Sequence, residues 1–163
     1  MAPGPEQARL TATVESLGAV AVGGDTPPPD TLILLAPLGL DAATAAVGLD
    51  PTRCVAIDTL FPYEFQACKH RATSDDTIAA MTGLFANDGA NVSVLRDSAG
   101  FVAQRVVGMI VSIACDIAQQ RVASVSDIDD AVRIGLGYPL GPISMGDALG
   151  ADRINTLLAN MYQ

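Results

Sequence analysis

Aromatic side chains are scarce in this chain of 163 residues: only 4% of its residues are aromatic and none is tryptophan. Charged residues are also few, at 17%, whereas half of all residues are hydrophobic. A disordered chain has the opposite balance, with little apolar and much charged sequence, so the composition excludes that class. The core must be built from alanine, valine, isoleucine and leucine, in one ordinary domain or two small ones.

Positive charge is the next deficit, because nine Lys and Arg residues face 18 Asp and Glu residues and the net charge is −9. The basic residues are scattered, so no patch exists to neutralise nucleic-acid phosphates. The most hydrophobic run, residues 106–115, is far shorter than the roughly 20 residues that span a bilayer. The N-terminus also lacks the features of a signal peptide. We therefore expect a cytoplasmic protein that binds neither nucleic acid nor membrane.

Metal-binding patterns are missing as well. The three cysteines, Cys54, Cys68 and Cys115, form no CxxC pair and have no histidine at ligand spacing. They are typical of free, buried thiols in a reducing compartment, and we expect no metal site. The single histidine, His70, lies between Lys69 and Arg71 and is more typical of a solvated basic cluster than of a phosphate or CoA contact.

Short apolar runs alternate with helical patterns in the first part of the chain, which predicts an α/β unit with a small parallel sheet. After Gly100 the pattern is helical only, and the segment 101–121 is expected to form the longest helix. We place a domain boundary near Asp97, giving an α/β domain over 1–97 and an all-α domain over 98–163. The expected strands are 19–22, 31–36, 53–57 and 91–95, and the expected early helices are 6–17, 41–47 and 73–85.

The segment 134–150 contains five glycines and two prolines between helical patterns. Such a composition is incompatible with one regular helix, so we predict a shaped loop that leads into a final helix. A loop of this kind fits against a neighbouring helix, a second subunit or a ligand. We select its residues Tyr138, Pro139, Gly141 and Pro142, together with Phe101, as an interface or substrate-cleft corner, and favour an inter-helix corner over an acyl-CoA contact.

Three motifs occur in order: Gly100-Phe101 before the long helix, the capping pattern of residues 124–130, and the Tyr-Pro-Leu-Gly-Pro run of residues 138–142. As an ordered set, they resemble the C-terminal helical domain of the 3-hydroxyacyl-CoA dehydrogenases, over residues 97–163. The resemblance implies a reduced Rossmann-like sheet followed by a helical dimerisation domain. In the intact family, the reaction is the NAD-dependent oxidation of a 3-hydroxyacyl-CoA to a 3-oxoacyl-CoA.

Several features that this reaction needs are absent from the sequence. There is no GxGxxG turn to hold a dinucleotide, and the first expected helix begins close to Met1. The positions that the resemblance matches to functional residues hold other side chains: Asp58 for the catalytic His, His70 for its partner Glu, Phe61 for an Asn before Pro62, Gln104 for the substrate-contacting Asn, and Pro37–Gly39 for the Ser region. We therefore predict no catalytic residues and no NAD binding in this chain.

The pattern most resembles the second half of bacterial long-form 3-hydroxybutyryl-CoA dehydrogenases, in which a degenerate Rossmann remnant precedes a second helical domain. We accordingly expect a fragment or truncated reading frame that acts in assembly, as a homodimer or with the catalytic half. Two alternatives stay open. One is a divergent enzyme that uses Asp58 and His70 as a swapped acid–base dyad, and the other is a module that binds acyl-CoA without chemistry.

Overall fold

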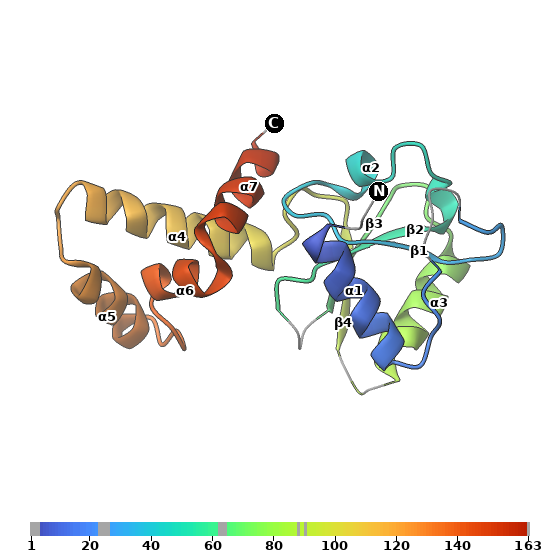
Figure 1. Cartoon of the computed structure of the whole chain (residues 1–163), viewed down its shortest axis with the longest axis horizontal. Coiled ribbons are helices and arrows are strands. Elements are labelled where there is room, and N and C mark those ends of the chain that lie inside the picture. Colours follow the sequence, from blue (N-terminus) through green and yellow to red (C-terminus); the bar gives the residue numbers. More distant parts are fainter. Residues whose placement is uncertain (1–3, 23–26, 62–64, 88, 90, 163) are drawn as a thin grey trace.

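The structure, a computed structural model, describes residues 4–22, 27–61, 65–87, 89 and 91–162 (Figure 1). Its sheet has the strand order β1-β2-β3-β4, with β1 Ile33–Leu35, β2 Cys54–Ile57, β3 Phe65–Lys69 and β4 Val92–Arg96. Strand β1 pairs with β2 in parallel and β3 with β4 in parallel, but β2 and β3 are antiparallel. The expectation of a parallel sheet is therefore confirmed for two of the three pairings.

The antiparallel pairing arises from a strand that the sequence did not reveal. Strand β3 follows β2 after a connection too short for a crossover helix, and such a connection joins antiparallel neighbours. Its sequence, Phe-Gln-Ala-Cys-Lys, mixes polar and apolar residues without the continuous apolar run of β2. The expected strand at 19–22 is wrong, because these residues have no regular structure and Val20 is 86% exposed.

Alternate residues of the strands face two different layers. The first layer consists of helix α1, Pro5–Ser16, and helix α3, Asp75–Ala86, whose buried Leu10 and Phe85 pack with Val55 and Ile57 of β2. The opposite layer consists of the short helix α2, Ala42–Ala45, and the residues that lead into α4. Because Val55 and Ile57 point to one face and the intervening Ala56 to the other, β2 is buried on both sides.

Side-chain caps begin two of these helices, as the sequence predicted. The Ser74 hydroxyl accepts a hydrogen bond from the Thr77 N–H at the start of α3, and the Asp41 carboxylate accepts one from the Thr44 N–H at the start of α2. Between α2 and β2, the 3₁₀ helix Pro51–Arg53 turns the chain into the sheet. The predicted helices and strands around 31–57 and 73–95 are thus confirmed, with ends shifted by at most two residues.

The rest of the chain is helical: α4 Ala103–Gln119, α5 Val125–Gly135, α6 Pro142–Leu149 and α7 Ala151–Met161. Helix α4 packs against α5, α6 and α7 and reaches back to the sheet (Figure 1). The expected shaped loop over 134–150 is only partly correct, because Pro142 begins the regular helix α6. Proline is favoured there, since the first helical position lacks a partner for its N–H. Gly150, with φ of 94°, then separates α6 from α7.

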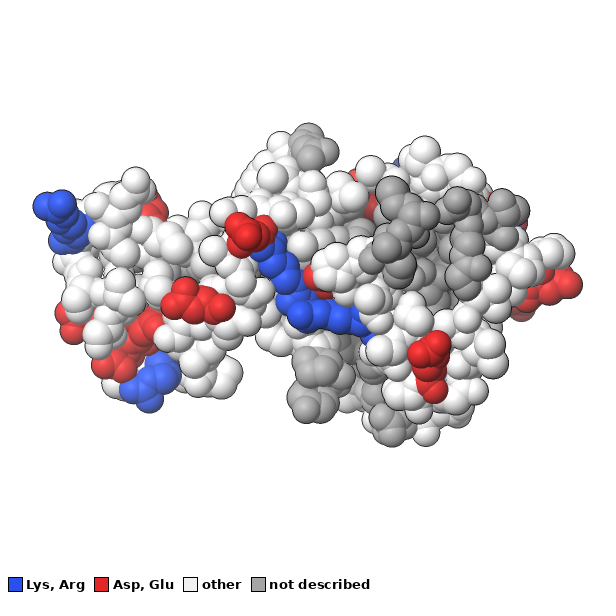
Figure 2. Space-filling view, viewed as in Figure 1, with Lys and Arg blue, Asp and Glu red and all other residues white. Residues whose placement is uncertain are grey.

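Strand β4 ends at Arg96 and α4 begins at Ala103, on either side of the boundary placed near Asp97. The division into domains 1–97 and 98–163 stays a prediction. Figure 2 shows the charged side chains of one face, on which the basic ones form a short band near the middle and isolated positions at the left end. Within the part of the chain that the structure describes, no helix combines the length and hydropathy needed to cross a membrane.

Candidate functional site

The position matched to the catalytic histidine lies at a buried seam between the sheet and the helices. Asp58 directly follows β2 and is 2% exposed, and Gln104 lies in the first turn of α4 and is 1% exposed. The Gln104 Nε2 donates to Asp58 Oδ1 at 2.9 Å, and the Leu60 N–H donates to the same oxygen at 2.8 Å. The sequence singled out both residues separately, and the structure brings them into direct contact.

Gln104 also binds the turn that follows β1, where the resemblance expects the serine region. Its Oε1 accepts from the Gly39 N–H at 2.8 Å, and its Nε2 donates to the Pro37 carbonyl at 3.3 Å. The Asn160 amide of α7 donates to the Leu38 carbonyl at 2.8 Å, so α4 and α7 both hold this turn. All the polar atoms of the Gln104 side chain are therefore used within the chain, and none is left for a substrate.

One oxygen of the seam remains unpaired. Asp58 Oδ2 is buried and has no hydrogen-bond partner in the described part of the chain. Burial raises the pKa of Asp58 above its ordinary value of 3.8, although hydrogen bonds from Gln104 and Leu60 oppose the rise. Removing a carboxylate from water disfavours its charged form, so burial favours a proton on this group. A carboxyl that is 2% exposed and already accepts from Gln104 and Leu60 is poorly placed to act as a general base.

A second polar contact joins the helices α1 and α7 near this seam. Arg153 of α7 donates from Nε to Glu6 Oε1 and from a terminal nitrogen to Glu6 Oε2, both at 2.7 Å. The Thr59 hydroxyl also donates to Glu6, at 2.8 Å. Burial alone would raise the pKa of Glu6, but the bonds from Arg153 and Thr59 outweigh it and hold the pKa below its ordinary value. Sequence reasoning missed this pair, because 147 residues separate its members.

The swapped dyad of Asp58 and His70 is wrong. Because β2 and β3 are antiparallel, the Asp58 N–H bonds to the carbonyl of Gln66, and Cys68 lies opposite Ala56. His70 is four residues beyond Gln66, which separates the two along the sheet by roughly 13 Å. The His70 Nδ1 instead accepts from the Ala72 N–H at 3.0 Å, in the turn after β3. The sequence match that paired His70 with Asp58 failed because β3 runs antiparallel to β2, which carries His70 away from the end of β2 where Asp58 lies.

The residues selected as an interface or cleft corner lie in two places. Phe101 has φ of 46° and is 2% exposed, in a cluster with Ala42 of α2 and Cys68 of β3. Tyr138 and Pro139 belong to the turn between α5 and α6, and these two helices lie away from the sheet (Figure 1). The structure therefore separates Phe101 from the remaining four selected residues.

Gly141 and Pro142 form a tight corner against α5. A Cβ atom on Gly141 would lie 2.3 Å from the Asp129 side chain, so only glycine fits. The Asp129 carboxylate accepts from the Ile143 N–H at 2.7 Å and the Ser144 N–H at 3.0 Å, which satisfies the start of α6. Asp129 belongs to the acidic capping pattern noted in the sequence, but its role at the next helix could not be derived from that pattern.

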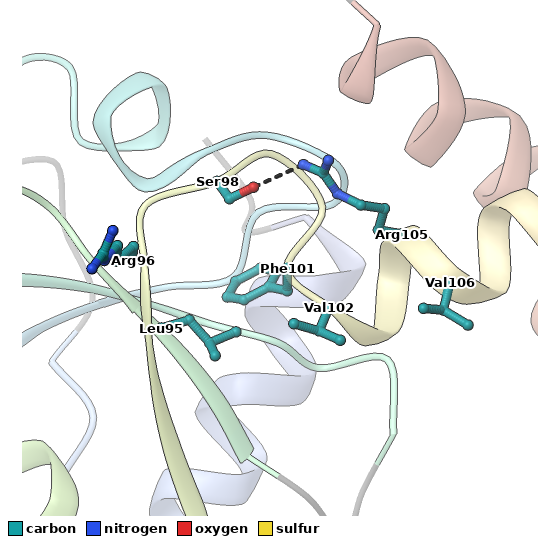
Figure 3. Close-up of a pocket in the computed structure, with 7 residues that line it drawn as sticks. All are labelled: Leu95, Arg96, Ser98, Phe101, Val102, Arg105 and Val106. Carbon is teal, nitrogen blue, oxygen red and sulfur yellow. Dashed lines mark hydrogen bonds between the residues drawn. The ribbon is translucent and has the colours of Figure 1, made fainter.

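An open pocket of about 390 Å³ lies where β4 meets the first turns of α4, and its lining residues are Leu95, Arg96, Ser98, Phe101, Val102, Arg105 and Val106 (Figure 3). Val102 and Val106 project from the same side of the helix, while Arg105 reaches back to donate to the Ser98 hydroxyl at 2.7 Å. The pocket walls are mostly apolar, and its arginines lie at the rim. This pocket is separate from the Asp58–Gln104 seam.

A dinucleotide needs free N–H groups at the start of a helix that follows a strand. At the start of α2, which follows β1, the Asp97 carboxylate already accepts from the Ala42 N–H at 2.6 Å and the Ala43 N–H at 3.0 Å. These two N–H groups are therefore not free to bind a phosphate. Among the described residues, no group of His, Cys, Asp and Glu is placed to hold a metal ion.

Comparison with known proteins agrees with the sequence resemblance. Residues 100–163 match the family model described as 3-hydroxyacyl-CoA dehydrogenase, C-terminal domain. The chain is similar to the 3-hydroxyadipyl-CoA dehydrogenase of Escherichia coli K12, with 44% identity over 73 residues, which are 45% of this chain and 15% of that protein. A probable 3-hydroxybutyryl-CoA dehydrogenase of Bacillus subtilis is 26% identical over 122 residues, or 72% of this chain and 42% of the relative.

Solved structures share the fold over most of the chain. The structure of 3-hydroxybutyryl-CoA dehydrogenase from E. coli K12 has a TM-score of 0.69 and 28% identity, covering 88% of this chain and 34% of that one. The structure of (S)-3-hydroxybutyryl-CoA dehydrogenase from Ralstonia eutropha has a TM-score of 0.74 at 20% identity, covering 99% of this chain and 56% of that one. This chain therefore spans only part of the length of its curated relatives, between 15% and 42% in the two sequences above.

Proposed function

We propose that this chain, whose residues 100–163 match the 3-hydroxyacyl-CoA dehydrogenase C-terminal domain model, is a non-catalytic assembly unit of such a dehydrogenase. The observation that carries the proposal is an exposed apolar face of α4, formed by Val102, Val106, Met109 and Ile113, which are 37% to 55% exposed. Their spacing of four, three and four residues places them on one side of the helix. We call this surface the outer face of α4.

The outer face is continuous with the pocket at β4, because Val102 and Val106 belong to both. Isolated exposed apolar residues are common, but a row of four beside an apolar pocket is typical of an interaction surface. Burial of such a row against a partner removes apolar area from water without any need for catalysis. We propose a second copy of the chain or a dehydrogenase catalytic half as that partner.

The seam supports the non-catalytic part of the proposal. A 3-hydroxyacyl-CoA oxidation needs a base that reaches the substrate hydroxyl. The residues at the matched positions, Asp58 and Gln104, bind each other, and His70 lies at the far end of the β2–β3 pair. This arrangement favours a chain that does not oxidise the substrate, and the missing GxGxxG turn favours one that binds no NAD. In the intact family enzyme, NAD and the 3-hydroxyacyl-CoA would bind to parts of the protein outside this chain.

Light scattering of the purified chain tests the assembly role. We expect a dimer at micromolar concentration, and Val106→Glu should shift it to monomer by placing a charge in the buried interface. Val47→Glu is the matched control, since Val47 is 80% exposed and lies outside the outer face. A wild-type chain that is monomeric alone and with a catalytic half, or a Val106→Glu dimer of unchanged affinity, would contradict the proposal.

Two further measurements separate the rival functions. Nicotinamide oxidation or reduction with acetoacetyl-CoA or 3-hydroxybutyryl-CoA should stay at the buffer rate if the chain is non-catalytic. Calorimetry with the same CoA esters should show no heat of binding for an assembly unit. Saturable heat that Arg105→Ala abolishes would instead favour the acyl-CoA-binding module, with the pocket of Figure 3 as its site.

A further inference from the structure

The sheet has two outer strands, β1 and β4, and different side chains protect their free edges. In the strand order, β1 has β2 on one side and no strand on the other among the described residues. An open strand edge presents unpaired N–H and C=O groups, which another chain can use to add a strand. The residues of β1, Ile33, Leu34 and Leu35, are all apolar, so an open edge here would favour aggregation.

A side chain from α1 occupies this edge. The Gln7 Nε2 donates to the Leu34 carbonyl at 3.2 Å, and the Gln7 Oε1 accepts from the Ala36 N–H at 3.2 Å. These two backbone groups flank Leu35 and are the pair that one residue of a neighbouring parallel strand would use. The primary amide of Gln7 has one donor and one acceptor in the same plane, as a backbone peptide does. It therefore reproduces a single step of strand pairing.

The amide is held in place by the residues around it on α1. Leu10, one turn further along, is 1% exposed in the main core, and the preceding Glu6 forms the paired bonds with Arg153 of α7. Gln7 itself is only half-buried, so apolar packing does not account for its position. By contrast, β4 carries the exposed residues Ser93, Val94 and Arg96, and the charge of Arg96 is a common means of protecting an open edge.

We infer that Gln7 guards the edge of β1 against strand addition by a second copy of this chain. Two β1 edges can pair antiparallel about a twofold axis, because each presents the same short apolar strand. With that edge closed, the outer face of α4 is left as the surface for assembly. The inference stands on the Gln7 contacts alone and does not depend on the proposed function.

The test replaces Gln7 in the Val106→Glu chain, where association through the outer face is suppressed. Gln7→Leu keeps an uncharged, branched side chain of similar size and removes both bonds. We expect the Ala36 N–H to exchange at least about fivefold faster in this variant, measured by NMR, because its acceptor is lost. We also expect a new concentration-dependent species by light scattering. Gln119→Leu, an exposed glutamine on α4 without a strand beside it, should change neither quantity.

Gln7→Glu keeps the acceptor for Ala36 and loses the donor for Leu34, so it resolves the two bonds even if Gln7→Leu is poorly folded. The Ala36 N–H should stay protected in this variant. Unchanged Ala36 exchange in Gln7→Leu, equal loss of protection in Gln7→Glu, or a Gln7→Leu chain that remains monomeric at every concentration would each overturn the inference.

Discussion

Helix α4 has two opposite faces that are both rich in small and apolar residues, yet only one of them is covered by this chain. The inner face contains Gln104 and Val107, which are 1% and 7% exposed, and it packs against α6 and α7. The outer face begins with Val102 and Val106, which are 50% and 46% exposed. Since 3.6 residues make one turn, positions 104 and 106 lie about 200° apart around the helix.

The difference between the faces lies in the polar group, not in the apolar residues. On the inner face, Gln104 joins Asp58, Pro37 and Gly39, so the seam has one defined geometry. On the outer face, the side-chain hydrogen bond within the described chain is a single one, from the Tyr162 hydroxyl to the Met109 sulfur at 2.9 Å. A face of valine, methionine and isoleucine alone can pack against another apolar surface without a unique register. We conclude that the inner face specifies the fold, whereas the outer face is available for association.

The largest expected effect comes from breaking the inner seam at Gly39. Its φ is +80°, and an added Cβ would lie 2.4 Å from the Leu157 carbonyl oxygen of α7. Gly39→Ala should therefore lower the free energy of unfolding by about 3 kcal/mol or more, because both the backbone strain and the clash must be relieved. Chemical denaturation monitored by circular dichroism measures the change.

Gly48 provides the control for that variant. It has φ of +84°, but no atom lies within 4 Å of the position that an added Cβ would take. Gly48→Ala should cost only the left-handed conformation, about 1 kcal/mol. Equal losses for the two alanine variants would mean that the approach of α7 to the turn after β1 contributes nothing to stability.

A smaller loss is expected when the polar group of the inner face is removed. Gln104→Leu leaves the Gly39 N–H and the Pro37 carbonyl without partners and takes one donor from Asp58. We expect a loss of about 2–3 kcal/mol in the free energy of unfolding, since buried groups are left unsatisfied. Val106→Glu on the outer face should change the same quantity for the monomer by less than about 0.5 kcal/mol. A larger loss for Val106→Glu than for Gln104→Leu would reverse the contrast between the faces.

Much of the fold followed from local patterns in the sequence. The apolar runs at 31–36 and 53–57 predicted β1 and β2, because strands buried on both faces need continuous apolar residues. Ser74 and Asp41 marked helix starts by their capping chemistry. Strand β3 was missed, since its direction and pairing depend on β2 and β4 more than on its own residues.

The candidate site was only partly predictable for the same reason. The resemblance pointed to Asp58 and Gln104 as altered positions, but their mutual bond links residues 46 apart and needed the structure. His70 was misplaced because the antiparallel turn of the chain moved it to the other end of the sheet. Glu6 and Arg153 left no signal at all, since a charge near each end of a chain has no periodicity to relate it to the other.

The smallest expected effect is the pH dependence of stability that arises from Asp58, whose Oδ2 is the unpaired oxygen on the inner side of α4. Burial raises the pKa of Asp58 above 3.8, so this group favours the folded state most below pH 3.8, and the contribution is lost as the pH rises through its folded pKa. In Asp58→Asn the side chain is neutral at every pH, like the protonated acid. The variant therefore does not lose stability as the pH rises through the folded pKa of Asp58. The stability of the variant relative to the wild type should therefore increase from pH 4 upward and become constant above the folded pKa of Asp58, as measured by thermal unfolding across the range. Glu6, whose pKa is lowered, acts in the opposite sense at lower pH and is present in both chains. Because the charge of Glu6 also raises the pKa of Asp58, the two chains are compared above the pH range in which Glu6 titrates. Asp147→Asn, which removes an exposed charge from α6, is the control, and a difference for Asp58→Asn that does not vary with pH would show that the buried carboxyl carries no proton linkage.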